Sequence, residues 1–165
     1  MATIRSTLRA LSQQNRPAAA LNLAGRALEV DLERSGSFMT LFHGLLDAGK
    51  RSMAYVDAGH GHVFVRRAGG AVETLPPRGL PLGVTFGERY VEGSLTFGAG
   101  DALVIYSDGL IDARPDLVLD PRVLANQLEA TIRAQEIVDR LVGLATLSGP
   151  LPDDLTVVVL RCRDD

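Results

Sequence analysis

Two amphipathic helices are predicted at the start of the chain, because apolar residues recur there every three to four positions. Asn15-Arg16-Pro17 separates the two segments, and Pro17 suits the first turn of the second helix. Ser35-Gly36-Ser37 then ends the second helix. The two apolar stripes consist of Ile4, Leu8 and Leu11, and of Leu21, Ala24, Leu28 and Leu32.

After residue 37 apolar and polar residues alternate, which is typical of strands with one buried face. The predicted strands cover residues 38–46, 53–56, 62–66, 71–75, 90–97, 102–106 and 155–162, with turns at 47–50, 69–70 and 98–101. Residues 76–83 contain three prolines and are predicted to lie outside any strand interior, because proline cannot donate to a strand ladder. Residues 102–106 are apolar on both faces, so we expect a central strand there.

Helical periodicity returns after residue 109. Two further helices are predicted from Leu124, Leu128 and Ile132, and from Ile137, Leu141, Leu144 and Leu147. The order is helices, a meander of short strands, helices and a last strand, which favours an α+β fold with stacked layers. We find no repeat or linker, so the sequence predicts a single domain over residues 1–165.

Composition narrows the function classes. With 165 residues that are 46% hydrophobic, the chain can build one sizeable core and is not disordered. A net charge of -3 argues against a nucleic-acid-binding surface, which requires a basic face. Neither a membrane span nor a signal peptide is recognisable, and Cys162 as the lone cysteine excludes an internal disulfide. These features predict a cytoplasmic protein.

Two acidic turns adjoin the most apolar strands. Ser107-Asp108-Gly109 follows residues 102–106, and Asp153-Asp154 precedes residues 155–162. If these strands pair antiparallel, Asp108 and Asp153 meet, and a divalent cation with oxygen ligands would offset their repulsion. Taken singly, each motif is more often an ordinary turn. The combination is what favours a metal site.

A third acidic position, Asp57, closes the strand at residues 53–56 and is followed by Gly59-His60. His60 and His62 could chelate zinc only with a third ligand, which the sequence does not offer, so we favour His60 as a structural or phosphate-facing loop residue. A serine hydrolase is disfavoured because no G-x-S-x-G elbow is present. Cys162 has no histidine nearby in the sequence and is interpreted as a bystander thiol.

The order of five motifs resembles that of a known enzyme family. These motifs are Phe38-Met39-Thr40-Leu41-Phe42-His43-Gly44, Tyr55-Val56-Asp57-Ala58-Gly59-His60, Gly79-Leu80-Pro81-Leu82-Gly83, Tyr106-Ser107-Asp108-Gly109 and Asp153-Asp154-Leu155-Thr156. The series resembles PPM-type (phosphatase 2C-like) serine phosphatases of the stage II sporulation protein E branch. This resemblance implies a two-layer antiparallel β-sandwich flanked by helices. It also implies a centre of two Mn²⁺ or Mg²⁺ ions, whose bound water attacks phosphoserine or phosphothreonine.

The resemblance also assigns residues. Asp108 and Asp153 match metal ligands, while Asp154, Gly109, Asp57 and His60 match positions beside the metals or facing the phosphate. Asp57 stands where relatives usually carry asparagine, and no protein side chain is assigned as the catalytic nucleophile. The expected substrate is a phosphorylated anti-sigma antagonist protein in a sigma-factor or stress signalling pathway.

Members of this branch also carry an N-terminal Gly-Asp-(aromatic)-Tyr-Asp motif that supplies further metal ligands, and these 165 residues do not contain it. The resemblance therefore implies a domain that is short on its N-terminal side, with an open sheet edge that favours self-association. Three hypotheses follow. The chain is a metal-dependent phosphatase, a non-catalytic phosphatase-like module that binds the same partner, or a remnant of the fold without an independent role.

Overall fold

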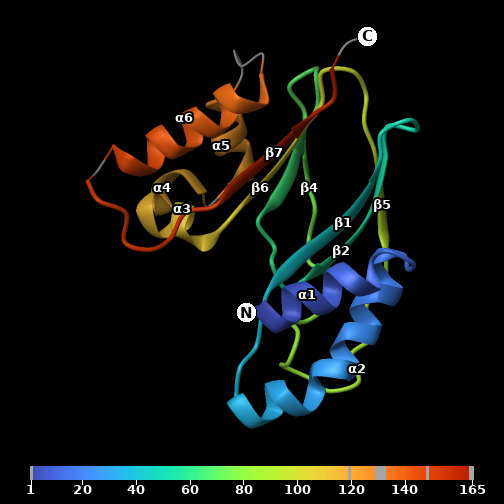
Figure 1. Ribbon diagram of the computed structural model, residues 1–165. Helices are drawn as coiled ribbons and strands as arrows, with labels where there is room; N and C mark the ends of the chain where they lie inside the picture. The colour runs from blue at the N-terminus through green and yellow to red at the C-terminus, as the bar shows by residue number, and fades with distance from the viewer. Residues whose placement is uncertain (1, 119, 129–132, 148, 164–165) are drawn as a thin grey trace. The chain divides into compact units, whose positions relative to one another are not determined.

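The computed structural model describes residues 2–118, 120–128, 133–147 and 149–163. Within these residues the elements labelled in Figure 1 follow the predicted order of helices, strands, helices and a final strand. The helices are α1 (Ala2–Leu11), α2 (Pro17–Ser35), α3 (Asp108–Ala113), α4 (Pro115–Val118), α5 (Pro121–Asn126) and α6 (Ala134–Thr146). The strands are β1 (Leu41–Asp47), β2 (Ser52–Ala58), β3 (Val63–Arg66), β4 (Val72–Thr74), β5 (Gly93–Thr96), β6 (Ala102–Tyr106) and β7 (Val157–Arg161).

The residues divide into two compact units. The first unit comprises Met1–Gly61 and Pro76–Thr96, and the second comprises His62–Leu75 and Phe97–Asp165. Each unit contains one antiparallel sheet together with its own helices. The predicted α+β class with antiparallel sheets is thereby confirmed.

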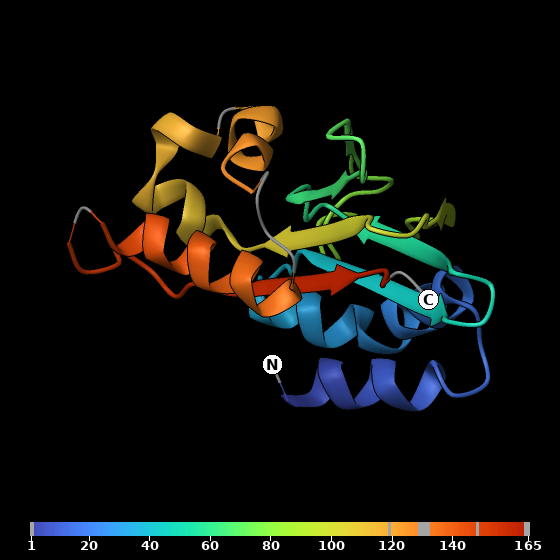
Figure 2. The same cartoon turned by 90° about the horizontal axis from the view of Figure 1, so that it is seen from above.

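In the first unit the sheet has the order β1-β2-β5. The β1–β2 hairpin forms at the predicted turn, where the backbone N–H of Lys50 donates to the Asp47 carboxylate over 3.0 Å. The apolar stripes of α1 and α2 pack on this sheet, and Figure 2 shows the two helices side by side. Their shared core consists of Leu21, Ala24, Leu28, Leu32, Val56, Ala58, Leu82 and Tyr90, with Ile4, Leu8 and Leu11 packed against it.

In the second unit the sheet has the order β4-β3-β6-β7. Strand β6 is an interior strand and Leu103 and Val104 are fully buried, as the apolar pattern on both faces predicts. Helices α5 and α6 supply the apolar side chains that cover the sheet. This core contains Phe64, Ala102, Val104, Tyr106, Leu110, Leu124, Ala125, Leu128, Ile137, Leu141 and Ala145.

Most boundaries differ from the prediction by a few residues. β1 begins at Leu41 rather than residue 38, because Met39 makes only an isolated bridge to Leu82. β7 begins at Val157, because the preceding residues form the acidic turn instead of pairing as a strand. Of the helix predicted from Leu124, Leu128 and Ile132, α5 covers Pro121–Asn126, Leu128 lies in the turn that follows, and Ile132 lies outside the described residues. Among the described helices, none combines the length and apolar character that a membrane crossing requires.

A buried carboxylate joins two turns of the second unit. Asp101 is 4% exposed and accepts hydrogen bonds from the Arg67 guanidinium at 2.7 Å and from the backbone N–H groups of Ala68 and Gly98 at 2.9 Å each. Burial disfavours its charge, but the hydrogen bonds from Arg67, Gly98 and Ala68 outweigh this effect. The pKa of Asp101 is therefore lowered from its ordinary value.

Asp101→Asn is expected to reduce the free energy of unfolding by about 1–3 kcal/mol at neutral pH, because the hydrogen bonds then lose a charged acceptor. A depressed folded-state pKa contributes stability above the unfolded pKa of about 4, and this stability is lost as pH falls through the folded value. Urea unfolding at several pH values tests this expectation. The difference between the wild type and the variant should shrink below about pH 4, and a constant difference from pH 7 to pH 2 would contradict it.

Candidate active site

The two acidic turns of the second unit are brought together by the pairing of β6 with β7. The strands are antiparallel, and Tyr106 at the end of β6 is paired with Val157 at the start of β7. One residue further, the backbone N–H of Ser107 donates to the carbonyl of Thr156 over 3.0 Å. Figure 2 shows the two strands side by side, with β6 leading directly into α3. The backbone segments that carry Asp108 and Asp153 therefore lie next to each other, as the sequence predicts.

Gly109 lies directly against the backbone of the turn that carries Asp154. A Cβ atom at this position would stand 2.4 Å from the carbonyl oxygen of Asp154 and 3.0 Å from its carbonyl carbon. Both atoms belong to the backbone, so no side-chain rotation could relieve the overlap. Glycine is needed here because of space, since Gly109 is the second residue of α3 and does not have a positive φ.

The carboxylates of Asp108, Asp153 and Asp154 at these turns are all exposed. Asp108 is the first residue of α3, and Asp153 and Asp154 precede β7 in an irregular segment. The backbone N–H of Asp154 donates to the Asp153 carboxylate over 2.7 Å, which orders the turn locally. Exposed carboxylate oxygens are suitable ligands for a hard divalent cation.

Asp108 and Asp153 fit a divalent metal by the chemistry of their donor atoms, but two carboxylates are fewer than such a centre requires. Within the part of the chain that the structure describes, no three or more histidine, cysteine, aspartate or glutamate side chains gather where they could hold a metal ion. The described residues therefore offer two ligand candidates rather than a complete site.

Asp57 and His60 belong to the first unit, where they form one local hydrogen-bonded loop. Asp57 lies at 0% exposure within β2, and its carboxylate accepts the backbone N–H of His60 at 2.7 Å and that of Gly61 at 3.0 Å. The Asp57 carboxylate thus holds the Gly59-His60-Gly61 turn from inside. In this position Asp57 shapes the loop and does not face solvent.

His62 is part of the second unit. Its ring stacks on that of Tyr106 with the centroids 5.5 Å apart. Within the described residues, neither His60 nor His62 belongs to a group of three metal-ligating side chains. A packing role for the His62 ring is therefore favoured over zinc chelation.

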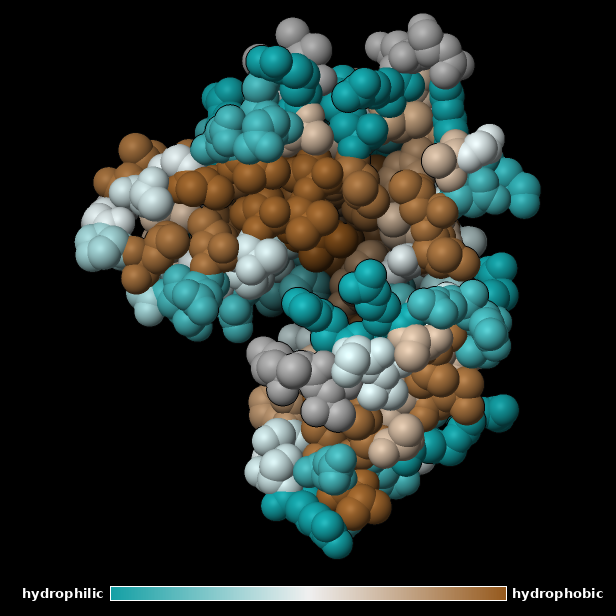
Figure 3. All heavy atoms as spheres, in the orientation of Figure 1, coloured by the Kyte–Doolittle hydropathy of each residue, from teal (hydrophilic) through white to brown (hydrophobic). Residues whose placement is uncertain are grey.

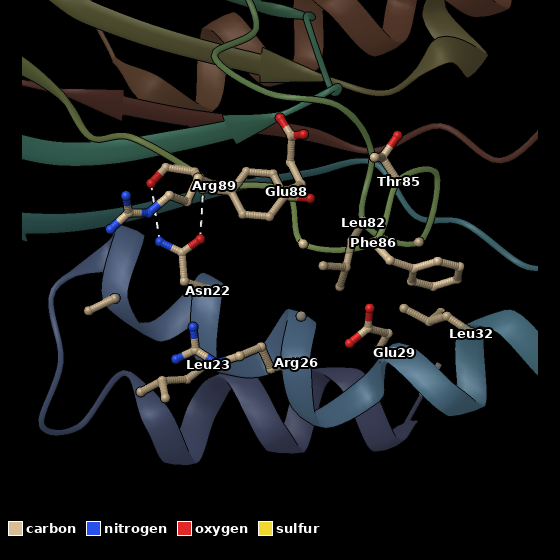
Figure 4. A pocket seen from close by; sticks show the side chains of 15 residues that line it. Asn22, Leu23, Arg26, Glu29, Leu32, Leu82, Thr85, Phe86, Glu88 and Arg89 are labelled. Atoms are coloured by element: carbon tan, nitrogen blue, oxygen red, sulfur yellow. Dashed lines mark hydrogen bonds between the residues drawn. The ribbon is translucent and has the colours of Figure 1, made fainter.

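A pocket of about 420 Å³ opens in the first unit between α2 and the loop over residues 82–90. Figure 4 shows Leu82 and Phe86 reaching down from the loop toward α2. The Asn22 amide fastens the loop by accepting the backbone N–H of Tyr90 at 2.9 Å and donating to its carbonyl at 3.2 Å. Burial and the nearby charge of Glu88 raise the pKa of Tyr90 to about 12.

Sequence reasoning missed this pocket and the hydroxyl of Ser107. The pocket is formed by an irregular loop, so no periodic pattern marks it. The sequence did contain a signal for Ser107, because it lies between a buried strand and an acidic turn. A serine hydroxyl in such a place can hydrogen-bond to neighbouring backbone groups.

A comparison with curated proteins finds a relative of known activity. Over 156 residues the chain is 27% identical to phosphoserine phosphatase RsbU from Bacillus subtilis, an alignment that covers 88% of this chain and 45% of RsbU. The chain spans less than half the length of the curated relatives it matches, 12% of one and 45% of the other.

Solved structures with the same fold are also found. The RsbU and RsbW domains of Rv1364c from Mycobacterium tuberculosis match with a TM-score of 0.75 and 26% identity, over 99% of this chain and 48% of that one. The PP2C phosphatase domain of SpoIIE from Bacillus subtilis matches with a TM-score of 0.78 and 22% identity, over 96% and 49% of the two chains. The catalytic domain of the serine/threonine protein phosphatase PstP, solved with 2 manganese ions, matches with a TM-score of 0.71 and 21% identity, over 98% and 79%.

The family model for stage II sporulation protein E matches residues 1–163, which is nearly the whole chain. This match agrees with the five motifs in the sequence and with the antiparallel sheets of the two units. The chain belongs to the stage II sporulation protein E (SpoIIE) family.

Proposed function

We propose that this chain is a metal-dependent protein serine/threonine phosphatase domain that hydrolyses phosphoserine on a regulatory protein. The observation that carries the proposal is the pairing of Tyr106 with Val157, which places the Asp108 and Asp153 turns side by side. Membership of the SpoIIE family and the similarity to RsbU, a phosphoserine phosphatase, support the reaction class.

In this proposal Asp108 and Asp153 hold Mn²⁺ or Mg²⁺, together with ligands beyond these two. Bound divalent ions supply hydroxide near neutral pH and neutralise phosphoryl oxygens. Asp154 and Gly109 set the shape of the paired turns, and Asp57 fixes the His60 loop in the first unit. The similarity to PstP, which was solved with manganese, supports the choice of metal.

We infer a phosphorylated anti-sigma antagonist as the substrate, and with it a cytoplasmic location. The similarity to the RsbU and RsbW domains of Rv1364c supports a place in sigma-factor regulation. The negative net charge of -3 is unfavourable for binding nucleic acid and leaves a protein as the favoured substrate.

The test is release of inorganic phosphate from a phosphoserine-bearing antagonist protein by the 165-residue chain, with Mn²⁺, with Mg²⁺ and with EDTA. We expect linear, metal-dependent release that EDTA abolishes. A flat time course at saturating Mn²⁺ would contradict the proposal.

A phosphatase-like binding module is the second candidate function. It is favoured by the small number of metal-ligating side chains gathered in the described part of the chain. This candidate predicts that the chain retains the phosphorylated antagonist on a pull-down column, releases it when phosphate is added, and leaves its phosphoserine intact. Turnover of the retained protein would exclude it in favour of the enzyme.

Self-association is proposed through the outer strands of the sheets. β7 pairs only with β6 among the described strands, and Val158 on it is 45% exposed. An apolar edge strand is a template for pairing with another chain, and an edge lysine opposes such pairing. Light scattering should show concentration-dependent dimers or larger species, reduced by Val158→Lys but not by Val142→Lys on α6. A monomer at all concentrations would contradict this prediction.

A further inference from the structure

A second pocket of the first unit lies between α1 and β1. It has a volume of about 450 Å³ and is formed by one side of α1, the turn that follows α1, and His43 of β1. The lining residues from the helix and its turn are Arg5, Leu8, Arg9, Ser12 and Gln13. They are spaced three or four positions apart, so they share one face of the helix. None of the described residues that line this pocket is acidic.

A pair of polar side chains joins the helix to the strand at this pocket. The Ser12 hydroxyl donates to the carbonyl of Leu8 at 2.7 Å, and its oxygen lies 3.0 Å from Nε2 of His43. A hydroxyl has one proton, and Leu8 receives it, so Nε2 of His43 is the donor in the second hydrogen bond. The imidazole ring is thereby held in place, and the two walls of the pocket are fixed to each other.

The pocket carries positive charge that the described residues do not neutralise. Arg5 and Arg9 are exposed, and within the described part of the chain neither is ion-paired with a carboxylate. Other arginines do have such a partner, namely Arg16, Arg67, Arg114 and Arg133. Residues 1–28 contain four arginines and no aspartate or glutamate, although the net charge of the whole chain is -3. Figure 3 shows strongly hydrophilic side chains gathered at α1.

This arrangement favours an anion as the ligand. Arg5 and Arg9 are one helical turn apart, and two like charges at this spacing repel each other, so a bound anion would relieve the repulsion. Guanidinium groups bind phosphate oxygens through pairs of parallel hydrogen bonds. The pocket is larger than a phosphate ion requires, and Leu8 and the arginine stems offer apolar surface for side chains next to a phosphorylated residue.

We propose that the pocket between α1 and β1 binds the phosphate group of a phosphoserine-bearing protein segment. The choice of a phosphoprotein as the source of the anion rests on the proposed function, whereas the positive charge of the pocket does not. The pocket belongs to the first unit and the Asp108 and Asp153 turns belong to the second. It would therefore be a docking site in addition to the site of hydrolysis.

A lipid surface fits this part of the molecule less well. A helix that lies on a membrane buries an apolar face in it. Among the described residues, none of the large exposed apolar side chains lies on α1. The apolar residues of this helix, Ile4, Leu8 and Leu11, instead pack against the core of the first unit.

The test is binding of a fluorescein-labelled peptide with one phosphoserine, flanked by alanine and leucine, to the 165-residue chain in EDTA. EDTA removes divalent metal, so metal-dependent binding elsewhere does not contribute. Fluorescence polarisation compares the wild type with Arg5→Gln/Arg9→Gln. The matched control is Arg34→Gln/Arg140→Gln, which removes the same charge from exposed positions on α2 and α6.

We expect binding of the phosphopeptide to be roughly tenfold weaker or more in Arg5→Gln/Arg9→Gln and nearly unchanged in the control, because each lost hydrogen bond joins two charged groups. The unphosphorylated peptide and inorganic phosphate should both bind more weakly than the phosphopeptide. On the wild type, the phosphopeptide should shift the NMR resonances of the His43 ring, which locates the binding without a mutation. Circular dichroism should show that both double variants are folded.

No binding of the phosphopeptide by the wild type, or equal affinity in the wild type and Arg5→Gln/Arg9→Gln, would overturn the proposal. An equal loss in both double variants would also overturn it, because only the overall charge would then matter. Inorganic phosphate that binds as tightly as the phosphopeptide would indicate a site for the free ion instead. Retention on phosphatidylserine vesicles without phosphopeptide binding would indicate a membrane surface.

The proposed function fails separately. It fails if the wild type binds the phosphopeptide through Arg5 and Arg9 but releases no phosphate from the phosphorylated antagonist when Mn²⁺ is supplied. Conversely, metal-dependent phosphate release that is accompanied by unchanged phosphopeptide affinity in Arg5→Gln/Arg9→Gln would retain the enzyme and remove the docking site.

Discussion

Asp108→Asn and Asp153→Asn are each expected to reduce metal-dependent phosphate release by roughly 100-fold or more. Asparagine keeps the size of the side chain but removes the negative charge and one anionic oxygen that a hard cation requires. Loss of about 3 kcal/mol of stabilisation of the transition state corresponds to this change in rate. Initial rates of phosphate release at saturating substrate and a fixed Mn²⁺ concentration measure the effect.

The fold should tolerate both substitutions. The two carboxylates are exposed, so the melting temperature should change by only about 1–2 °C. Asp31→Asn is the matched control, because Asp31 is exposed on α2 in the first unit and should retain full activity. Full activity of either Asp108→Asn or Asp153→Asn would show that the ligands lie elsewhere.

Gly109→Ala is expected to destabilise the second unit by about 2–3 kcal/mol, because overpacking against fixed backbone costs this much. The added Cβ would stand 2.4 Å from the carbonyl oxygen of Asp154, and only a shift of the segment before β7 could make room. The melting temperature should fall by about 5–10 °C. Differential scanning calorimetry measures it.

Gly143→Ala is the control for this prediction, because the same substitution there has room for the added Cβ. Gly143 lies within α6, and a Cβ there would meet nothing within 4 Å. Alanine should stabilise the helix by about 0.5–1 kcal/mol, because glycine loses more conformational freedom on folding. If Gly109→Ala were as stable as Gly143→Ala, the close packing of the two acidic turns would be wrong.

Local pattern was sufficient to predict most elements. Leu103 and Val104 are apolar neighbours on opposite faces of one strand, which indicates burial on both sides, and β6 is indeed an interior strand. The prediction that the turns of Asp108 and Asp153 lie side by side followed from assuming that the two most apolar strands pair antiparallel, and the structure confirms that pairing.

Features that depend on partners distant in the sequence could not be predicted. Alternation identifies strands but not their neighbours, so the pairing of β2 with β5 rather than with β3 was not foreseeable. Val158 lies in a run of valines that gives no sign of an exposed face, yet it is 45% exposed. Its neighbours Val157 and Val159 pack against the helical core, and Val158 lies on the opposite face of β7. The burial of Asp57 depends on the loop that folds back over it, which no local signal encodes.

Calorimetric titration of the chain with Mn²⁺, beside the Asp108→Asn/Asp153→Asn double variant, tests most directly whether the paired acidic turns are the metal site. We expect saturable Mn²⁺ binding by the wild type and none by the double variant, with both proteins equally folded by circular dichroism. Equal Mn²⁺ affinity in the two proteins would contradict the assignment of Asp108 and Asp153 as ligands.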